Sequence, residues 1–110
     1  MAYGELQAER LRAAIGQRTG VIAQRMMGSL VYMLDGHMLA GTRTTADGER
    51  FMFRVGADAI PEALKRAGAR PAVMGGRTMK DFVFVADCDD ASLAEWTRLA
   101  LDFVGALPPK

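Results

Sequence analysis

The sequence has few of the residues from which most catalytic and metal sites are built. Its 110 residues include one cysteine, one histidine and one tryptophan, and aromatic residues make up 7%. Because Cys88 has no second cysteine, an intramolecular disulfide is excluded, and no Cys/His cluster has metal-ligand spacing. No titratable residues are spaced as an acid/base pair or a nucleophilic relay. We therefore expect a protein that is not an enzyme, holds no metal or cofactor and works in the reducing cytoplasm.

Long apolar runs are also missing. No hydrophobic stretch approaches the length needed to cross a bilayer, and the N-terminal MAYGELQAERLRAAIG mixes acids with arginines where a secretory signal would be apolar. With 50% hydrophobic residues, 110 residues suffice for one compact core. The sequence predicts a single domain over residues 1–110 that does not enter a membrane.

The net charge is only +1, but charge is distributed unevenly along the chain. Residues 10–80 hold 12 basic and 5 acidic side chains, whereas residues 81–110 hold 2 basic and 6 acidic ones. Such a basic body could attract phosphates or an acidic protein, or could simply solvate strand edges and helix backs. The lack of a dense basic run favours the second interpretation.

Hydrophobic periodicity predicts an α+β fold with the element order α-β-β-β-β-α-β-β-α. We expect an amphipathic helix over residues 5–15, a short helix from an Asp58 N-cap to Gly68, and a long one opened by a Ser92/Glu95 capping box. The expected strands span residues 21–27, 30–34, 37–42, 51–55, 71–74 and 80–86.

Turn residues and alternation arrange these strands in an antiparallel sheet. Asp35-Gly36 predicts a type I′ hairpin turn, and Asp47-Gly48 repeats the signal. Phe51 and Phe53 alternate with Met52, which is typical of a strand with one buried face. We expect a two-layer sandwich in which helices cover one face of the sheet.

Five short segments recur in a family-like order along the chain: RMMGSL (25–30), DGHM (35–38), RVG (54–56), GRTMK (76–80) and LPPK (107–110). Together they resemble the N-terminal domain of the TfoX/Sxy family, which is associated with the regulation of competence genes in some bacteria. In the first segment, Met27 replaces the family's aromatic residue and Ser29 its second glycine. The family's regulators carry a second, helical C-terminal domain that does not follow here, so the resemblance implies a free-standing module.

The resemblance implies a regulatory module that binds a protein partner and has no enzymatic activity, with a homodimer as a candidate assembly. Arg25, Arg77 and Lys80 lie in these segments and are expected to converge near Gly75-Gly76, where they would bind an anion or an acidic partner. The alternative is that these charges only keep the strand edges soluble. The residues implied as partner contacts are Arg25, Met26, Met27, Gly28, Arg77, Met79 and Lys80.

Direct binding of nucleic acid through the basic body is the alternative function. It is less favoured because no predicted helix has an exposed basic face for a major groove, and aromatic platforms for single strands are not evident.

Other residues that could carry chemistry have simpler interpretations. His37 has no partner for a nucleophilic relay and is expected to face solvent at a turn. Acidic neighbours should disfavour the Cys88 thiolate. The cluster of Asp87, Asp89 and Asp90 suits the N-terminus of the last helix better than a calcium site. The methionines alternate with apolar strand residues, which favours adaptable packing, or a docking patch on an uncovered sheet face, over a Cu(I) site.

Overall fold

The computed structural model describes residues 3–26 and 28–109, and the strand prediction for Met27 lies outside them. The helices are α1 (Glu5–Ile15), α2 (Ile60–Ala63) and α3 (Asp90–Val104), with a 3-10 turn, η1 (Ala57–Ala59), before α2. The strands are β1 (Val21–Met26), β2 (Ser29–Leu34), β3 (His37–Thr45), β4 (Gly48–Arg54), β5 (Ala69–Met74) and β6 (Arg77–Ala86). The predicted α+β class is confirmed. No helix in the described ranges is long and apolar enough to span a membrane.

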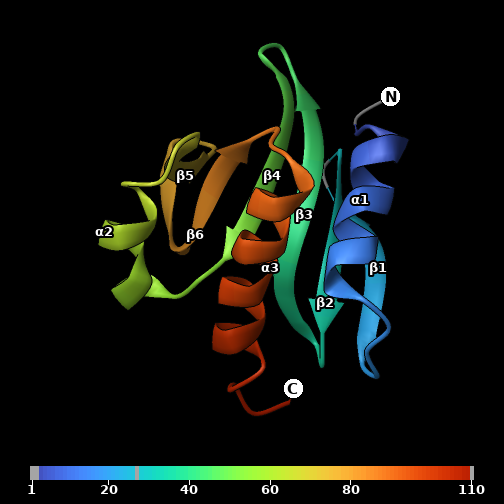
Figure 1. Ribbon diagram of the computed structural model, residues 1–110. Helices are drawn as coiled ribbons and strands as arrows, with labels where there is room; N and C mark the ends of the chain where they lie inside the picture. Colours follow the sequence, from blue (N-terminus) through green and yellow to red (C-terminus); the bar gives the residue numbers. More distant parts are fainter. Residues whose placement is uncertain (1–2, 27, 110) are drawn as a thin grey trace.

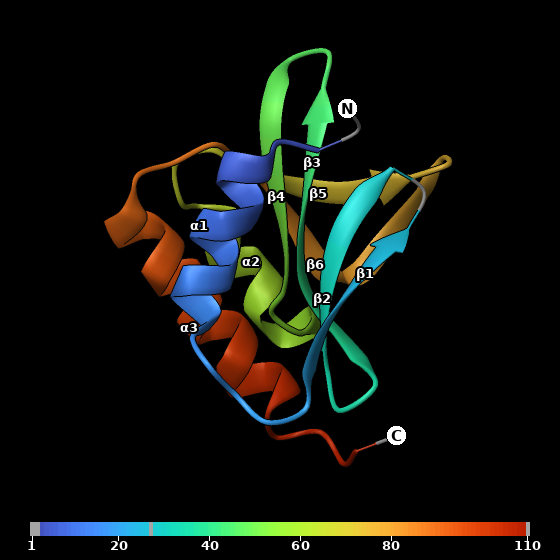
Figure 2. The same cartoon turned by 90° about the vertical axis from the view of Figure 1, so that its right-hand side faces the viewer.

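All six strands form one antiparallel sheet in the order β1-β2-β3-β4-β6-β5. Helices α1 and α3 pack against each other and lie across the middle of the sheet, while α2 lies beside β6 (Figure 1). In Figure 2 the two long helices lie on one side of the sheet, and both ends of the sheet curve away from them. The expected two-layer arrangement, with helices on one face, is therefore present.

The hairpin turns use residues that tolerate a positive φ angle. Asp35 (φ 51°) and Gly36 (φ 87°) form the predicted turn between β2 and β3. The next turn lies one residue earlier than the Asp47-Gly48 dipeptide suggests, because Thr45 pairs with Gly48 and Gly48 already begins β4. This one-residue difference decides which side chains face each other across β3 and β4.

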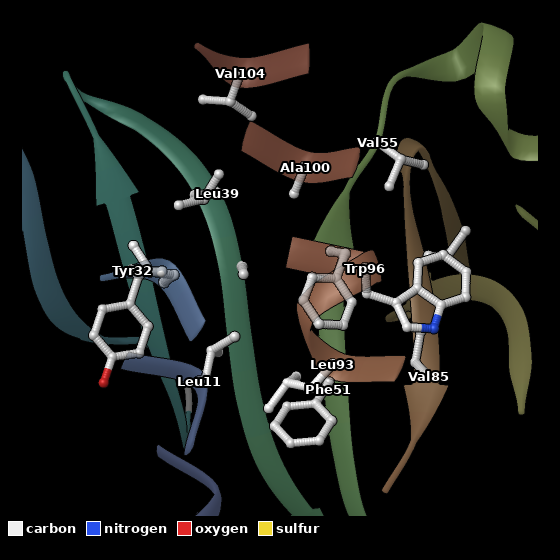
Figure 3. Close-up of a cluster of buried hydrophobic side chains, with 14 of the residues drawn as sticks. Leu11, Tyr32, Leu39, Phe51, Val55, Val85, Leu93, Trp96, Ala100 and Val104 are labelled. Atoms are coloured by element: carbon white, nitrogen blue, oxygen red, sulfur yellow. The ribbon is translucent and has the colours of Figure 1, made fainter. Parts of the chain in front are cut away.

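Aromatic side chains of β4 organise the core between the helices and the sheet. Phe51 and Phe53 have 0% exposure, and the Trp96 ring of α3 stacks on Phe53 with centroids 5.8 Å apart. Figure 3 shows Leu11 of α1 and Leu93 of α3 in the same buried cluster. The side of β4 that carries Phe51 and Phe53 is therefore the side on which both long helices pack.

Arg10 ties α1 to the loop that precedes α3. Its Nε donates to Asp90 at 2.9 Å and its Nη1 donates to Asp87 at 3.0 Å. Its Nη2 donates to the Cys88 carbonyl oxygen. The acidic cluster that the sequence assigns to the last helix therefore also anchors the first one.

The short helix predicted between Asp58 and Gly68 is wrong in its start and its length. Asp58 lies within η1, and its side chain caps no helix. Helix α2 has four residues, of which Ala63 is buried, and Leu64 beyond it is 36% exposed. A segment with so little apolar contact to the sheet cannot offset the entropy of a longer helix.

The predicted capping box at the start of α3 is also wrong. The N-cap is Asp89, whose carboxylate accepts a hydrogen bond from the Ser92 backbone N–H at 2.8 Å. Glu95 pairs with Arg66 at 3.3 Å instead of reaching back to the helix start. Aspartate caps as well as serine does, so two overlapping N-cap patterns competed and the earlier one prevailed.

We predict that Asp89→Ala lowers the melting temperature by a few degrees at neutral pH, and by more than Ser92→Ala does, because it removes the cap. The Ser92 hydrogen bond holds the pKa of Asp89 below its ordinary value, so the stabilisation is present above about pH 3.9 and is lost as pH falls through the lower folded-state pKa. Thermal unfolding followed by circular dichroism at neutral and acid pH measures both effects. An equal loss in Ser92→Ala would contradict the assignment.

Candidate functional site

The face of the sheet opposite the helices, here called the open face, carries a row of residues that crosses all six strands. The residues of this row are paired with one another across neighbouring strands. In the next row of the same face, Arg43 of β3 lies opposite Arg50 of β4. The helices of the described chain pack on the other face (Figure 2). From β1 to β5 in sheet order, the row is Gln24, Val31, Gly41, Met52, Phe84 and Arg70.

The open face carries a narrow cleft of about 20 Å³. Val31 and Phe84 are only 2% and 4% exposed, although they lie on the side away from the helices. Ser29 of β2 and Met74 of β5 line the same cleft, although β3, β4 and β6 lie between their strands in the sheet. Curvature of the sheet therefore brings the two outer hairpins toward each other. We call this cleft the trough; its open-face residues are Ser29, Gly41, Arg43, Arg50, Met52, Met74 and Phe84.

The absence of a side chain at Gly41 leaves space at the centre of the trough. A Cβ atom at this position would lie 3.0 Å from the Leu30 carbonyl oxygen and 3.4 Å from the Val31 side chain. The terminal methyl group of Met52 would lie 3.6 Å from the same point. The thioether side chain of Met52 therefore lies close over the glycine, and it is flexible enough to move for a ligand.

Two arginines, Arg43 and Arg50, line the trough, and Arg70 lies next to it. Arg43 faces Arg50 directly across β3 and β4, and Arg70 lies opposite Phe84 across β5 and β6. Like charges directly opposite each other on neighbouring strands destabilise a sheet. Within the described residues, Arg50 and Arg70 form no ion pair with a carboxylate. The fold therefore gathers three cationic side chains on one side of the sheet.

Phe84 holds Arg50 in position. The guanidinium carbon of Arg50 lies 3.7 Å from the centroid of the Phe84 ring, which is a close cation–π contact. Burial lowers the pKa of Arg50, and repulsion from Arg43 and Arg70 lowers it further. Arginine stays protonated in proteins, so the unfavourable interaction persists as repulsion between cations. A carboxylate or phosphate bound among the three guanidinium groups would relieve that repulsion.

The trough continues into a second hollow of about 100 Å³ that Arg50 and Arg70 also line. Asp47 and Glu49 form the far side of this hollow. The Glu49 carboxylate accepts hydrogen bonds from the Thr44 hydroxyl at 2.7 and 3.1 Å. Glu49 lies on the same side of β4 as Phe51, and its carboxylate is next to Gly4 just before α1, so its charge faces the helix side and not the trough.

The partner-binding residues implied by the resemblance lie around the tips of the two outer hairpins. Arg25 is exposed near the end of β1, Met26 is half-buried, and Gly28 is exposed with φ 85°. Met27 lies outside the described residues. The guanidinium carbon of Arg25 is 5.9 Å from the Tyr3 ring, and its register places it in a helix-side row with Leu30. This side chain points away from the trough.

The remaining three predicted contacts belong to β6. Arg77 and Lys80 are exposed, and Met79 is half-buried. Arg77 pairs with Met74, whose side chain lines the trough. Strands β2, β3 and β4 lie between β1 and β6 in the sheet, so the convergence of Arg25 with these residues remains a prediction.

His37 is not the solvent-facing turn residue that the sequence predicts. It begins β3, is half-buried, and its Nε2 lies 2.7 Å from the Pro108 carbonyl oxygen, which accepts a hydrogen bond. The prediction for Cys88 is confirmed in direction: burial chiefly raises the pKa of its thiol, and three nearby aspartates add to the effect. Within residues 3–26 and 28–109, no three His, Cys, Asp or Glu side chains gather as a possible metal site.

Sequence reasoning did not find the group formed by Arg43, Arg50, Arg70 and Phe84. A turn centred on Asp47-Gly48 would set Arg43 opposite Met52, whereas the observed turn sets it opposite Arg50. The predicted strand begins at Phe51 and leaves Arg50 out, whereas β4 begins at Gly48 and its alternation sets Arg50 on the face opposite Phe51. The contribution of β5 depends on sheet order and curvature, for which the sequence has no local signal.

Comparison with known proteins adds no relative, because no family model, curated protein or solved structure matches the chain.

We predict that Arg50→Met changes the free energy of unfolding by less than about 1 kcal/mol at low salt, because it removes both the repulsion from Arg43 and Arg70 and the opposing cation–π contact with Phe84. Added salt should stabilise the wild-type chain more than the variant, since ions screen the arginines. Urea unfolding at low and high ionic strength measures both quantities. A variant less stable than wild type at every salt concentration would show that Arg50 stabilises the fold.

Proposed function

We propose that this chain is a non-enzymatic regulatory interaction module whose trough binds an acidic, partly apolar segment of a protein partner. The observation that carries the proposal is the arginine group on the open face: Arg43 and Arg50 line the trough together with Met52 and Met74, and Arg70 lines the adjoining hollow. A group of cations next to methionine side chains fits a role in binding an acidic, partly apolar segment.

The apolar floor favours a protein segment over a simple anion. Met52 and Met74 line the trough and are half-buried, and Met33 is half-buried on the same face. Methionine side chains adapt to ligands of different shape, which suits the interleaved apolar residues of an acidic peptide. The peptide carboxylates would accept hydrogen bonds from the guanidinium groups.

A nucleic-acid ligand is supported less well by the same surface. Single-stranded binding sites offer aromatic faces on which bases stack. Phe84 is 4% exposed with Arg50 over its ring, and Phe82 is half-buried within 5.5 Å of the Arg54 guanidinium carbon. Neither ring offers a free face of that kind.

The regulatory context of the proposal comes from the resemblance to the TfoX/Sxy N-terminal domain. If the family assignment holds, the partner belongs to a transcriptional or competence-regulating system in the bacterial cytoplasm. The resemblance implies Met26, Gly28, Arg77, Met79 and Lys80 as contacts next to the trough; Met27, which it also implies, lies outside the described residues. Arg25 points away from the trough, so its implied contact would lie on the helix side of the hairpin.

Selection from a random peptide display library against the immobilised protein tests the proposal. We predict enrichment of peptides in which Asp or Glu alternates with Leu, Met or Phe, because the trough combines cations with an apolar floor. Fluorescence anisotropy then gives the affinity of the best peptide and of a dT12 oligonucleotide. The double variant Arg50→Met/Arg70→Gln should weaken peptide binding at least tenfold, which corresponds to about 1.4 kcal/mol.

The matched control is Arg18→Gln/Arg98→Gln, which removes the same charge from two exposed arginines elsewhere. It should leave peptide affinity within about twofold if local geometry, and not net charge, governs binding. Enrichment of peptides without acidic residues would refute the proposal. So would tighter binding of dT12 than of any selected peptide, with the loss confined to the Arg50/Arg70 variant; that result would favour the nucleic-acid function.

A further inference from the structure

The two edges of the sheet differ in how well they are protected from pairing with another strand. Natural edge strands are blunted by proline, charge or bulges. The edge strand β5 carries Pro71 and Arg70, and its register is irregular between Pro71 and Val73. The opposite edge strand, β1, pairs with β2 in unbroken register from Val21 to Met26 and contains no proline.

Strand β1 is also accessible. All six of its residues are exposed or half-buried, and Ile22 keeps 60% of its surface exposed on the open face. On the helix side, a hollow of about 670 Å³ borders Val21 and Ala23, so α1 does not close over this edge. Its only charged residue, Arg25, lies near the Tyr3 ring and outside the plane of the sheet. Backbone groups along this edge can therefore meet another strand.

We infer that β1 is a self-association edge, at which β1 of a second copy pairs antiparallel about a two-fold axis through Gln24. Side chains that lie opposite each other in a continuous sheet point to the same face. The two-fold axis must therefore pair even-numbered residues of β1 with even-numbered ones, and odd-numbered with odd-numbered. This register sets Ile22 opposite Met26 of the second copy and Ala23 opposite its Arg25. Apolar side chains then meet on the open face, and the two Arg25 side chains do not oppose each other.

The charge distribution favours this edge over face-to-face association. Two copies stacked through their open faces would bring both arginine groups together. Pairing at β1 keeps them apart, because Arg43, Arg50 and Arg70 belong to β3, β4 and β5. The result would be one twelve-stranded sheet whose two troughs lie on the same side, and this inference does not depend on what the troughs bind.

Light scattering during size-exclusion chromatography tests the edge. The wild-type chain should move toward twice its 11.9 kDa mass as concentration rises. Ile22→Lys should remain monomeric with an unchanged melting temperature, because the substituted side chain is exposed. The matched control is Val73→Lys on the opposite edge, where Val73 is 47% exposed; this variant should dimerise like the wild type.

Cysteine cross-linking tests the register, in a Cys88→Ser background. In the Gln24→Cys variant, the two introduced cysteines, one from each copy, would lie directly opposite each other with their Cβ atoms about 4.5–5.5 Å apart. This variant should oxidise to a disulfide-linked dimer. Ile22→Cys would leave its mates about 13 Å apart along the strand and should not cross-link. A monomeric wild type at its highest soluble concentration would refute the inference. A dimer unaffected by Ile22→Lys, or equal cross-linking at both positions, would equally refute it.

Discussion

The packing of Trp96 on Phe53 fixes which face of the sheet the helices cover, and the rest of the molecule depends on it. The two rings are 5.8 Å apart at their centroids and inclined by only 14°, in a region with no solvent exposure at Phe53. Because side chains alternate along a strand, burying Phe51 and Phe53 under α3 sends Arg50 and Met52 to the other side. The helix layer and the open face are thus two consequences of one alternation.

The chemistry of the open face follows from how much helix the chain contains. Helices α1 and α3, with 11 and 15 residues, cover one face of six strands, and the opposite face buries its own apolar side chains by curvature. Val31 and Phe84 are buried in this way. Arginines lie next to this self-covered floor, which combines a hydrophobic surface with fixed positive charge. Rigid strands carry both, so the site is organised before any ligand arrives.

Elements with strong local signals were predictable, whereas those that depend on tertiary context were not. Residues 5–15 and the Asp35-Gly36 turn appear where periodicity and turn chemistry predict them. The start of α3 was misplaced because Asp89 and Ser92 both satisfy N-cap preferences. The arginine group of the open face could not be derived from the sequence. It requires a register shifted by one turn residue, a strand order that places β6 beside β4, and curvature of the whole sheet.

The Arg10 contacts join residues that lie 77 to 80 positions apart in the chain. During synthesis, α1 leaves the ribosome long before its partners do, and the contact between α1 and α3 cannot form until the loop before α3 has emerged. Until then the nascent sheet has two uncovered faces, and its long-range pairings are slow to form. Closure of the core over Phe51 and Phe53 therefore waits for the C-terminal part of the chain.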